Sequence, residues 1–112
     1  MEPEERFIQV FTTFENRSDA EDVLRHLVLE RLAACVQLIG PIHSTYHWQG
    51  KVESSEEWLG LIKTSQALYA EVETEIKKRH PYTCPEILAV PVVAANPDYL
   101  QWMRQELKRR DE

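Results

Sequence analysis

Hydrophobic and polar positions alternate along several stretches of the chain, and the period of the alternation changes from one stretch to the next. Between Arg6 and Phe14, β-branched and aromatic residues recur at alternate positions, which predicts a strand. From Asp19 to Leu32 the apolar residues recur three and four positions apart, which predicts a helix. Ser18 and Glu21 have the spacing of a capping box at its start. The apolar stripe that we expect this helix to bury comprises Ala20, Val23, Leu24, Leu27 and the stem of Arg31.

The longest patterned stretch, from Cys35 to Thr64, predicts a β-hairpin that turns at Gln49-Gly50. A two-residue loop there places Trp48 opposite Lys51 and Tyr46 opposite Glu53. Near the turn, two sets of side chains alternate between the two faces of the first strand. They are Ser44, Tyr46 and Trp48 on one face and His43, Thr45 and His47 on the other.

The reach of this hairpin suggests self-association. A strand from Cys35 to Trp48, at about 3.3 Å per residue, extends over roughly 46 Å. A compact domain of this length has a diameter of roughly 35 Å, so we expect the tip to project. Its exposed aromatic residues and unpaired edges would then be covered by another chain. The alternative is a hairpin that a bulge at Gly40-Pro41 bends back onto its own core.

Three more elements follow the hairpin. The segment from Ser65 to Arg79 has Leu68, Val72 and Ile76 at four-residue spacing, which predicts a helix that His80-Pro81 ends. The apolar run from Glu86 to Val93 predicts a strand, in which Pro91 favours an edge or a bulge. Asn96-Pro97-Asp98 predicts the start of a last helix. That helix extends to about Lys108, and its inner face comprises Leu100, Met103 and Leu107.

The predicted order of elements is β, α, β, β, α, β, α. This order is typical of an α+β fold, a ferredoxin-like βαββαβ sandwich with a four-stranded antiparallel sheet and two helices on one face. The long hairpin and a C-terminal helix are additions to it. We expect residues 1–112 to form one domain, because no linker or internal repeat divides the chain.

Composition narrows the classes of function. Lys and Arg total 13 against 19 Asp and Glu, a net charge of −6, which disfavours nucleic acid as a partner. The N-terminus lacks a signal-peptide pattern and the chain lacks an apolar run of membrane-spanning length. We therefore expect a cytoplasmic protein without a membrane partner. Cys35 and Cys84 have no CxxC or metal-ribbon spacing and are expected to be free thiols.

Candidate chemistry is concentrated in the segment RHPYTCPEI. It brings together His80, Cys84 and Glu86, whose imidazole, thiol and carboxylate suit Cu or Zn, although their spacing matches no closed tetrahedral site. His43 and His47, roughly 13 Å apart along one strand, cannot hold one metal ion together. No phosphate-binding loop, nucleophile elbow or Ser-His-Asp pattern is present, so the sequence supports neither an enzyme nor an obligatory cofactor.

Four blocks of sequence resemble, in the same order, the signature blocks of the CutA family of divalent-cation tolerance proteins. They are RLAACVQLIGPIHSTYHWQGKV, LIKT, RHPYTCPEILAVPV and PDYLQWM, and the resemblance covers the chain from about Phe7 to Leu107. The resemblance implies a ferredoxin-like fold, a cytoplasmic homotrimer whose long hairpins join the sheets edge to edge, and tolerance to copper and other divalent metals.

The resemblance also implies which residues could bind metal. Family members proposed to bind copper have a cysteine near the end of the first strand, a histidine before His-Pro-Tyr and the glutamate of the Pro-Glu pair. These places hold Phe11, Arg79 and Glu86 here, so two of the three ligands are missing. We therefore expect weak binding of a divalent metal at most, through Glu86 with His80 and Cys84.

Five residues are candidates for a cleft or interface between subunits: Tyr46, Trp48, Lys63, Thr64 and Tyr82. Three kinds of function remain open for them. The first is divalent-cation tolerance, and the second is a scaffold or signalling trimer, similar to the PII proteins, that binds a small molecule between subunits. The third is an enzyme whose site lies in the same cleft, with Lys63, His80, Tyr82 and Glu86 as acid and base groups.

Overall fold

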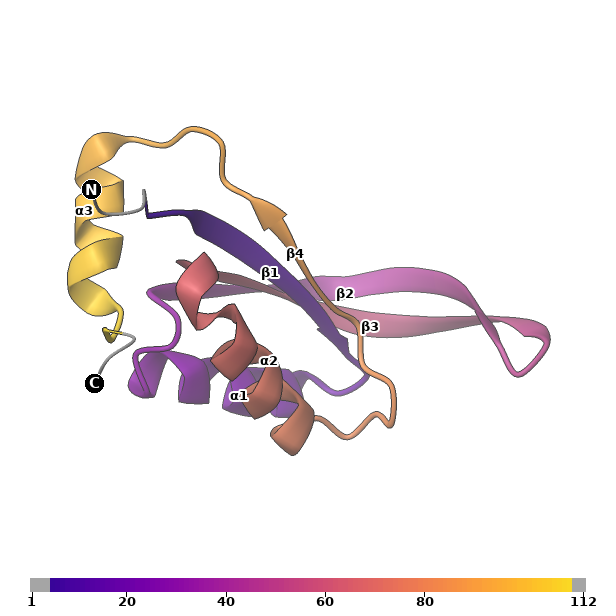
Figure 1. Ribbon diagram of the computed structural model, residues 1–112. Helices are drawn as coiled ribbons and strands as arrows, with labels where there is room; N and C mark the ends of the chain where they lie inside the picture. Colours follow the sequence, from indigo (N-terminus) through magenta and orange to yellow (C-terminus); the bar gives the residue numbers. More distant parts are fainter. Residues whose placement is uncertain (1–4, 110–112) are drawn as a thin grey trace.

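The structure, a computed structural model, describes residues 5–109 of the 112-residue chain. Figure 1 shows a long β-ribbon that extends away from the helices. The elements follow in the order β1 (Phe7–Phe14), α1 (Arg17–Leu29), β2 (Cys35–Trp48), β3 (Lys51–Ser65), the 3-10 helix η1 (Gln66–Leu68), α2 (Tyr69–Arg79), β4 (Ile87–Pro91) and α3 (Pro97–Glu106). The α+β fold class and the order of its elements are confirmed.

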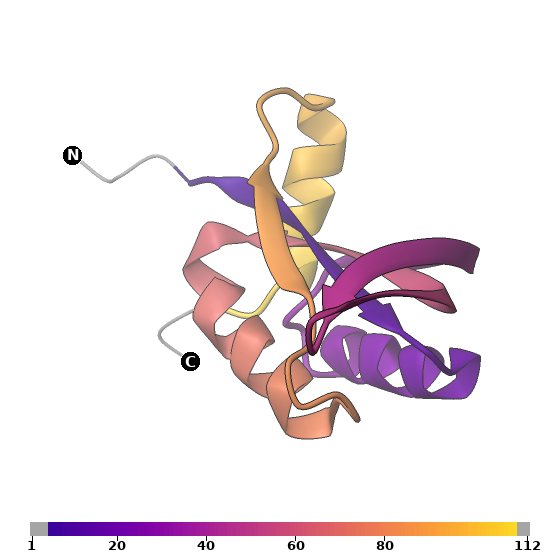
Figure 2. The same ribbon diagram turned by 90° about the vertical axis from the view of Figure 1, so that its right-hand side faces the viewer.

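The four strands form one antiparallel sheet in the order β2-β3-β1-β4. Figure 2 shows α1 and α2 side by side along one face of this sheet. Helix α3 lies at the end of the sheet away from the hairpin tip (Figure 1). Strands β2 and β4 are the two edges, so β4, which ends at Pro91, is the edge strand that this proline favours.

The core lies between the sheet and the two helices that cover it. Its fully buried side chains include Val10 and Phe14 of β1, Ile62 of β3, Leu27 of α1, and Val72 and Ile76 of α2. Alternation along β1 directs Phe11 to the opposite face, and Phe11 pairs across the ladder with Leu88. Leu88 is 48% exposed, so that second face presents apolar side chains that the helices α1 and α2 leave uncovered.

The hairpin of β2 and β3 projects from the domain (Figure 1), and the chain measures 51 × 25 × 22 Å. Gln49 and Gly50 both have positive φ, as the tight turn requires. The predicted pairings of Trp48 with Lys51 and of Tyr46 with Glu53 are confirmed. The pairing register shifts between Ile39 and Ile42, so a bulge lies where Pro41 suggested one. The hairpin does not fold back onto its core, and that alternative is wrong.

The start of α1 differs from the prediction. The cap is Asn16, whose side chain accepts hydrogen bonds from the Ser18 N–H at 2.9 Å and the Ser18 hydroxyl at 2.6 Å. Glu21 pairs with Arg17 at 2.7 Å instead of closing a capping box. The capping-box prediction is wrong because Asn16, an equally good cap, stands two residues earlier and lengthens the helix at this end.

The end of α1 differs as well. The helix stops at Leu29 rather than Leu32, because Arg31 has a φ of 57° and turns the chain toward β2. The Arg31 side chain is exposed and forms an ion pair with Glu106, so its predicted burial is wrong. The rest of the predicted stripe is buried, namely Ala20, Val23, Leu24 and Leu27.

The C-terminal half follows its sequence signals closely. Asn96 caps α3 by accepting a hydrogen bond from the Asp98 N–H at 2.9 Å. Met103 and Leu107 are buried, as predicted for the inner face. Within residues 5–109, no helix combines the length and the apolar character that crossing a lipid bilayer requires.

Candidate functional site

His80 anchors the loop that leads from α2 to β4. Its ring is buried, stacks on Phe14 with ring centroids 4.3 Å apart, and donates from Nε2 to the Thr13 carbonyl at 2.7 Å. Its Nδ1 accepts the Tyr82 N–H at 3.1 Å. A carbonyl only accepts and an N–H only donates, so the ring is the neutral Nε2–H tautomer. Burial lowers the pKa of His80, which favours the same neutral form.

Tyr82 links this loop to the base of the hairpin. Its phenol donates a hydrogen bond to Oε2 of Glu57 at 2.8 Å. Glu57 belongs to β3 and is only 7% exposed, which is unusual for a carboxylate. Burial, and then the neighbouring Glu57 charge, raises the pKa of the Tyr82 phenol. The phenol therefore stays protonated and acts as a donor.

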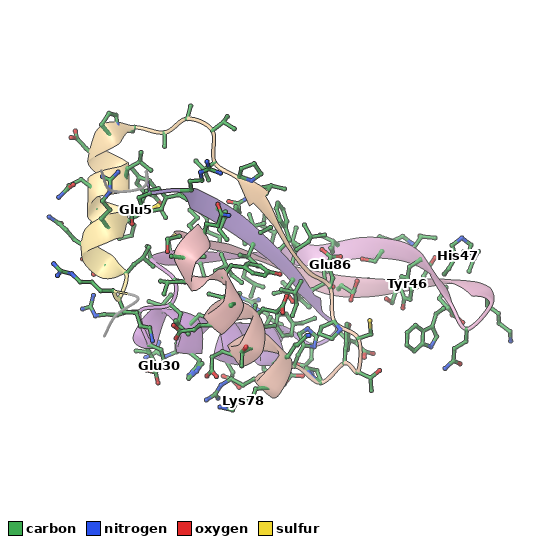
Figure 3. All side chains as sticks on the ribbon, viewed as in Figure 1. Glu5, Glu30, Tyr46, His47, Lys78 and Glu86 are labelled. Atoms are coloured by element: carbon green, nitrogen blue, oxygen red, sulfur yellow. The ribbon has the colours of Figure 1, made fainter. Side chains whose placement is uncertain are left out.

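Glu86 completes a group that we name the Glu57 cluster, which comprises Glu57, His80, Tyr82 and Glu86. Figure 3 shows Glu86 where the hairpin leaves the domain, with Tyr46 and His47 further out along the ribbon. Burial raises the pKa of the Glu86 carboxyl, and the Glu57 charge adds to the effect. Two carboxylates therefore share one corner of the molecule, and one of them holds its proton more readily than usual.

The sequence prediction missed Glu57. Nothing in the sequence distinguishes it from Glu53 or Glu56, which lie on the same strand and are exposed. Its burial depends on Tyr82, which is 25 residues further along the chain and reaches back to the hairpin. One sequence signal could have drawn attention to it. Just after Glu57 the polar residues give way to Trp58 and further apolar residues, and this change marks where β3 enters the domain.

The predicted metal ligands do not form a closed site in this arrangement. Both ring nitrogens of His80 are already hydrogen-bonded, so neither offers a free lone pair. Cys84 is an exposed free thiol in the same loop. Over residues 5–109, no three or more His, Cys, Asp or Glu side chains are placed to hold a metal ion together. Metal binding through Glu86, His80 and Cys84 stays a prediction.

The five predicted cleft residues divide into separate regions of the chain. Tyr46 bonds to Ser55 at 3.2 Å along the ribbon, close to Tyr82, while Trp48 stands at the tip and is 47% exposed. Thr64 is buried near the other end of β3, where its hydroxyl donates to the Leu32 carbonyl at 2.6 Å. Lys63, beside it, donates to the side chain of Gln37. One chain alone therefore does not bring the two ends of β3 into a common cleft.

Comparison with known proteins gives a consistent result. The family model described as CutA1 divalent ion tolerance protein matches residues 8–106. The divalent-cation tolerance protein CutA of Thermus thermophilus is 40% identical over 96 residues, which are 86% of this chain and 93% of that protein. The chloroplastic protein CutA of Arabidopsis thaliana is 36% identical over 90% of this chain, which spans only 56% of that relative.

A solved structure agrees with the sequence relatives. The structure of the divalent cation tolerance protein Cut A1 from Thermus thermophilus superposes with a TM-score of 0.89 at 37% identity. The match covers 91% of this chain and 99% of that one. The described fold therefore has a counterpart of known structure over nearly its whole length.

Proposed function

Because the chain belongs to the CutA1 family of divalent ion tolerance proteins, we propose that it acts as a cytoplasmic homotrimer that binds divalent metal weakly. The observation that carries the proposal is the projecting hairpin, which a single chain leaves uncovered. Val52 is 66% exposed, Trp48 47% and Tyr46 41%. Apolar and aromatic surface on an unpaired ribbon is normally covered by another chain.

The sheet offers further support for assembly. Within residues 5–109, neither of its edges, β2 and β4, has a partner strand on its outer side. Besides Tyr46 and Trp48, three large aliphatic side chains on β2 and β4 are at least 40% exposed, namely Ile39, Leu88 and Val90. Copies arranged around a threefold axis would let each hairpin reach the next copy and would close the ring without leaving a free edge.

The donor atoms of the Glu57 cluster support weak rather than tight metal binding. With the nitrogens of His80 occupied and the Tyr82 phenol protonated, the ligand atoms that the cluster offers to a metal are the carboxylate oxygens of Glu86 and Glu57. Oxygen donors suit hard divalent ions, whereas copper favours nitrogen and sulfur. We propose that the cluster takes up divalent cations with little preference for copper and remains open to water.

The cytoplasmic location is also part of the proposal. Both cysteines are free thiols, as is usual in a reducing compartment. The chloroplastic relative makes a direct measurement necessary, because proteins of this family occur in more than one compartment. Fractionation of cells that express the full chain, followed by detection in the cytoplasmic fraction, tests this point.

Two measurements test the assembly and the metal. Size exclusion coupled to light scattering is expected to give three times the mass of one chain, and a monomer at micromolar concentration would overturn the trimer. Calorimetric titration with Cu(II) and Zn(II) is expected to saturate at one equivalent per subunit, with a dissociation constant of about 1 μM or weaker. Nanomolar binding would show that the cluster rearranges into a tighter site than this conformation offers.

A further inference from the structure

At the end of the molecule opposite the hairpin tip, a groove of about 510 Å³ lies between α3 and the turn that joins α1 to β2. Besides Leu107, its lining consists of four basic residues and two amides: Arg31, Arg104, Lys108, Arg109, Gln101 and Gln105. Among residues 5–109, no Asp or Glu lines it, although the chain as a whole carries a net charge of −6. We name it the basic groove.

A second groove, of about 420 Å³, adjoins the first at Lys108, and its other charged lining residues are acidic. Its lining includes Glu30, Glu71 and Glu75 from α1 and α2. The charged side chains that line the two grooves therefore differ in sign on the two sides of Lys108, while Glu106 and Glu5, the partners of Arg31 and Arg104, stand outside the lining of the basic groove. A solvated surface that served solubility alone would be expected to intersperse the two signs. The separation indicates a surface that distinguishes anions from cations.

The basic side chains are held in place by contacts within the chain. Arg31 donates from Nη1 to the carbonyl of Glu106 at 3.0 Å and to its carboxylate at 3.2 Å. Arg104 donates from Nε to Glu5 at 2.8 Å and lies over the ring of Phe7. The first contact also neutralises a carbonyl at the C-terminal end of α3, which would otherwise repel an anion. Both guanidinium groups are therefore positioned before any ligand arrives.

Each arginine still has donors to offer. Toward the described residues, Arg31 uses only Nη1, and Arg104 uses Nε and Nη1, the latter toward Gln101 at 3.5 Å. Arg109 forms no hydrogen bond or ion pair with another residue of the 5–109 region. Lys108 is paired with Glu71 at 2.7 Å, while its backbone N–H donates to the Arg31 carbonyl at 2.9 Å and closes the groove.

From this arrangement we propose that the basic groove binds the phosphate chain of a polyphosphate. A single carboxylate carries one charge and would meet arginines whose charges Glu106 and Glu5 already offset in part. A chain of two or three phosphates carries several charges and can contact more than one guanidinium at once. Guanidinium groups bind phosphate oxygens through paired N–H donors, which favours phosphate over other polyanions. Within the described part of the chain, Leu107 is the only apolar lining residue, so the groove has no place for a nucleobase.

The test uses the full-length chain and sodium tripolyphosphate in low salt without divalent metal, with heat of binding as the readout. We expect a dissociation constant below about 1 mM, and we expect this constant to increase as NaCl is added. The double variant Arg31→Gln/Arg109→Gln is expected to bind about tenfold more weakly. The control Arg25→Gln/Lys77→Gln changes the net charge equally but removes exposed residues outside the groove, and we expect less than about a twofold effect.

Two further comparisons make the outcome decisive. Arg109→Gln alone removes no contact with another described residue, so it keeps the fold, and we expect it to weaken binding by about threefold. Adenosine triphosphate is expected to bind no more tightly than tripolyphosphate, because only the phosphate chain is held. The proposal is overturned if tripolyphosphate gives no heat at about 1 mM, if both double variants weaken binding equally, or if the nucleotide binds about tenfold more tightly.

Discussion

The Tyr82 phenol donates a hydrogen bond to the Glu57 carboxylate across 2.8 Å, and this bond fastens the loop after α2 to the base of the hairpin. Through the backbone N–H of Tyr82, the same residue is tied to His80, which in turn is bonded to the Thr13 carbonyl of β1. A series of hydrogen bonds therefore runs from β1 through the loop to β3 at the base of the hairpin.

Replacing Tyr82 with Phe tests how much this series of hydrogen bonds stabilises the fold. The substitution keeps the ring but leaves the buried Glu57 carboxylate without its phenolic donor, and we expect a loss of about 1–3 kcal/mol in the free energy of unfolding. Denaturation by urea at fixed protein concentration measures it. Tyr69→Phe is the matched control, because its phenol also donates to a carboxylate, that of Glu73 at 2.9 Å, but Glu73 is 38% exposed and can bond to water instead, so the loss should cost within about 0.5 kcal/mol. Equal losses in the two variants would show that the bond to Glu57 stabilises the fold no more than the control bond does.

His80 makes stability depend on pH. Its pKa is lowered in the folded chain, so the folded state binds fewer protons than the unfolded state between that pKa and the ordinary value of 6.5. The contribution to stability is complete above pH 6.5 and is lost as the pH falls through the lowered pKa. We expect the free energy of unfolding to be lower at about pH 5 than at about pH 7.5, with part of the difference depending on His80.

Substitution separates this effect from the titration of the carboxylates. In His80→Gln the drop over the same pH range should be smaller, because the amide does not titrate there. His47→Gln, at the exposed end of the ribbon (Figure 3), should keep the drop of the parent protein. If the two variants respond to pH alike, protonation of His80 does not destabilise the fold.

Most of the fold could be predicted because its signals are local. The alternation that ends at Trp48, the turn at Gln49-Gly50 and the Asn96 cap each depend on a few neighbouring residues, and each was confirmed. The start of α1 was misplaced because Asn16 and Ser18 are both good caps two residues apart. Only the positions of the first helical N–H groups decide between them.

The candidate site was less predictable because it is assembled from distant segments. His80 and Glu86 stood out in the sequence, but the hydrogen bond that occupies Nε2 of His80 is made to the Thr13 carbonyl, 67 residues earlier. The step from polar residues to Trp58 marks where β3 enters the domain, but only the contact with Tyr82 shows that Glu57 belongs to the site. Lys63 and Thr64 lie near the other end of β3 from the cluster, and only a second copy in the proposed trimer could bring them to it.

The assembly prediction concerns Trp48. It shares a face of the ribbon with Tyr46, while His47 points to the other face, and it is 47% exposed in the single chain. If that face is buried between subunits, Trp48→Ala should cost about 3–5 kcal/mol of assembly free energy, and His47→Ala much less. A dilution series followed by light scattering measures both. A Trp48→Ala variant that stays trimeric with an unchanged melting temperature would place this residue outside the interface.

The metal prediction follows from the raised pKa of Glu86. A divalent cation must displace the proton that burial and the Glu57 charge help this carboxyl to retain, so we expect metal affinity to fall as the pH is lowered from about 7.5 to about 5. Glu86→Gln removes the charge and should weaken Zn(II) binding by about tenfold at the higher pH. Glu56→Gln is the matched control, because Glu56 is exposed, stands opposite His43 in the strand register and lies on the opposite face of β3 from Glu57. An affinity that does not change with pH, or an equal loss in both variants, would place the metal away from the Glu57 cluster.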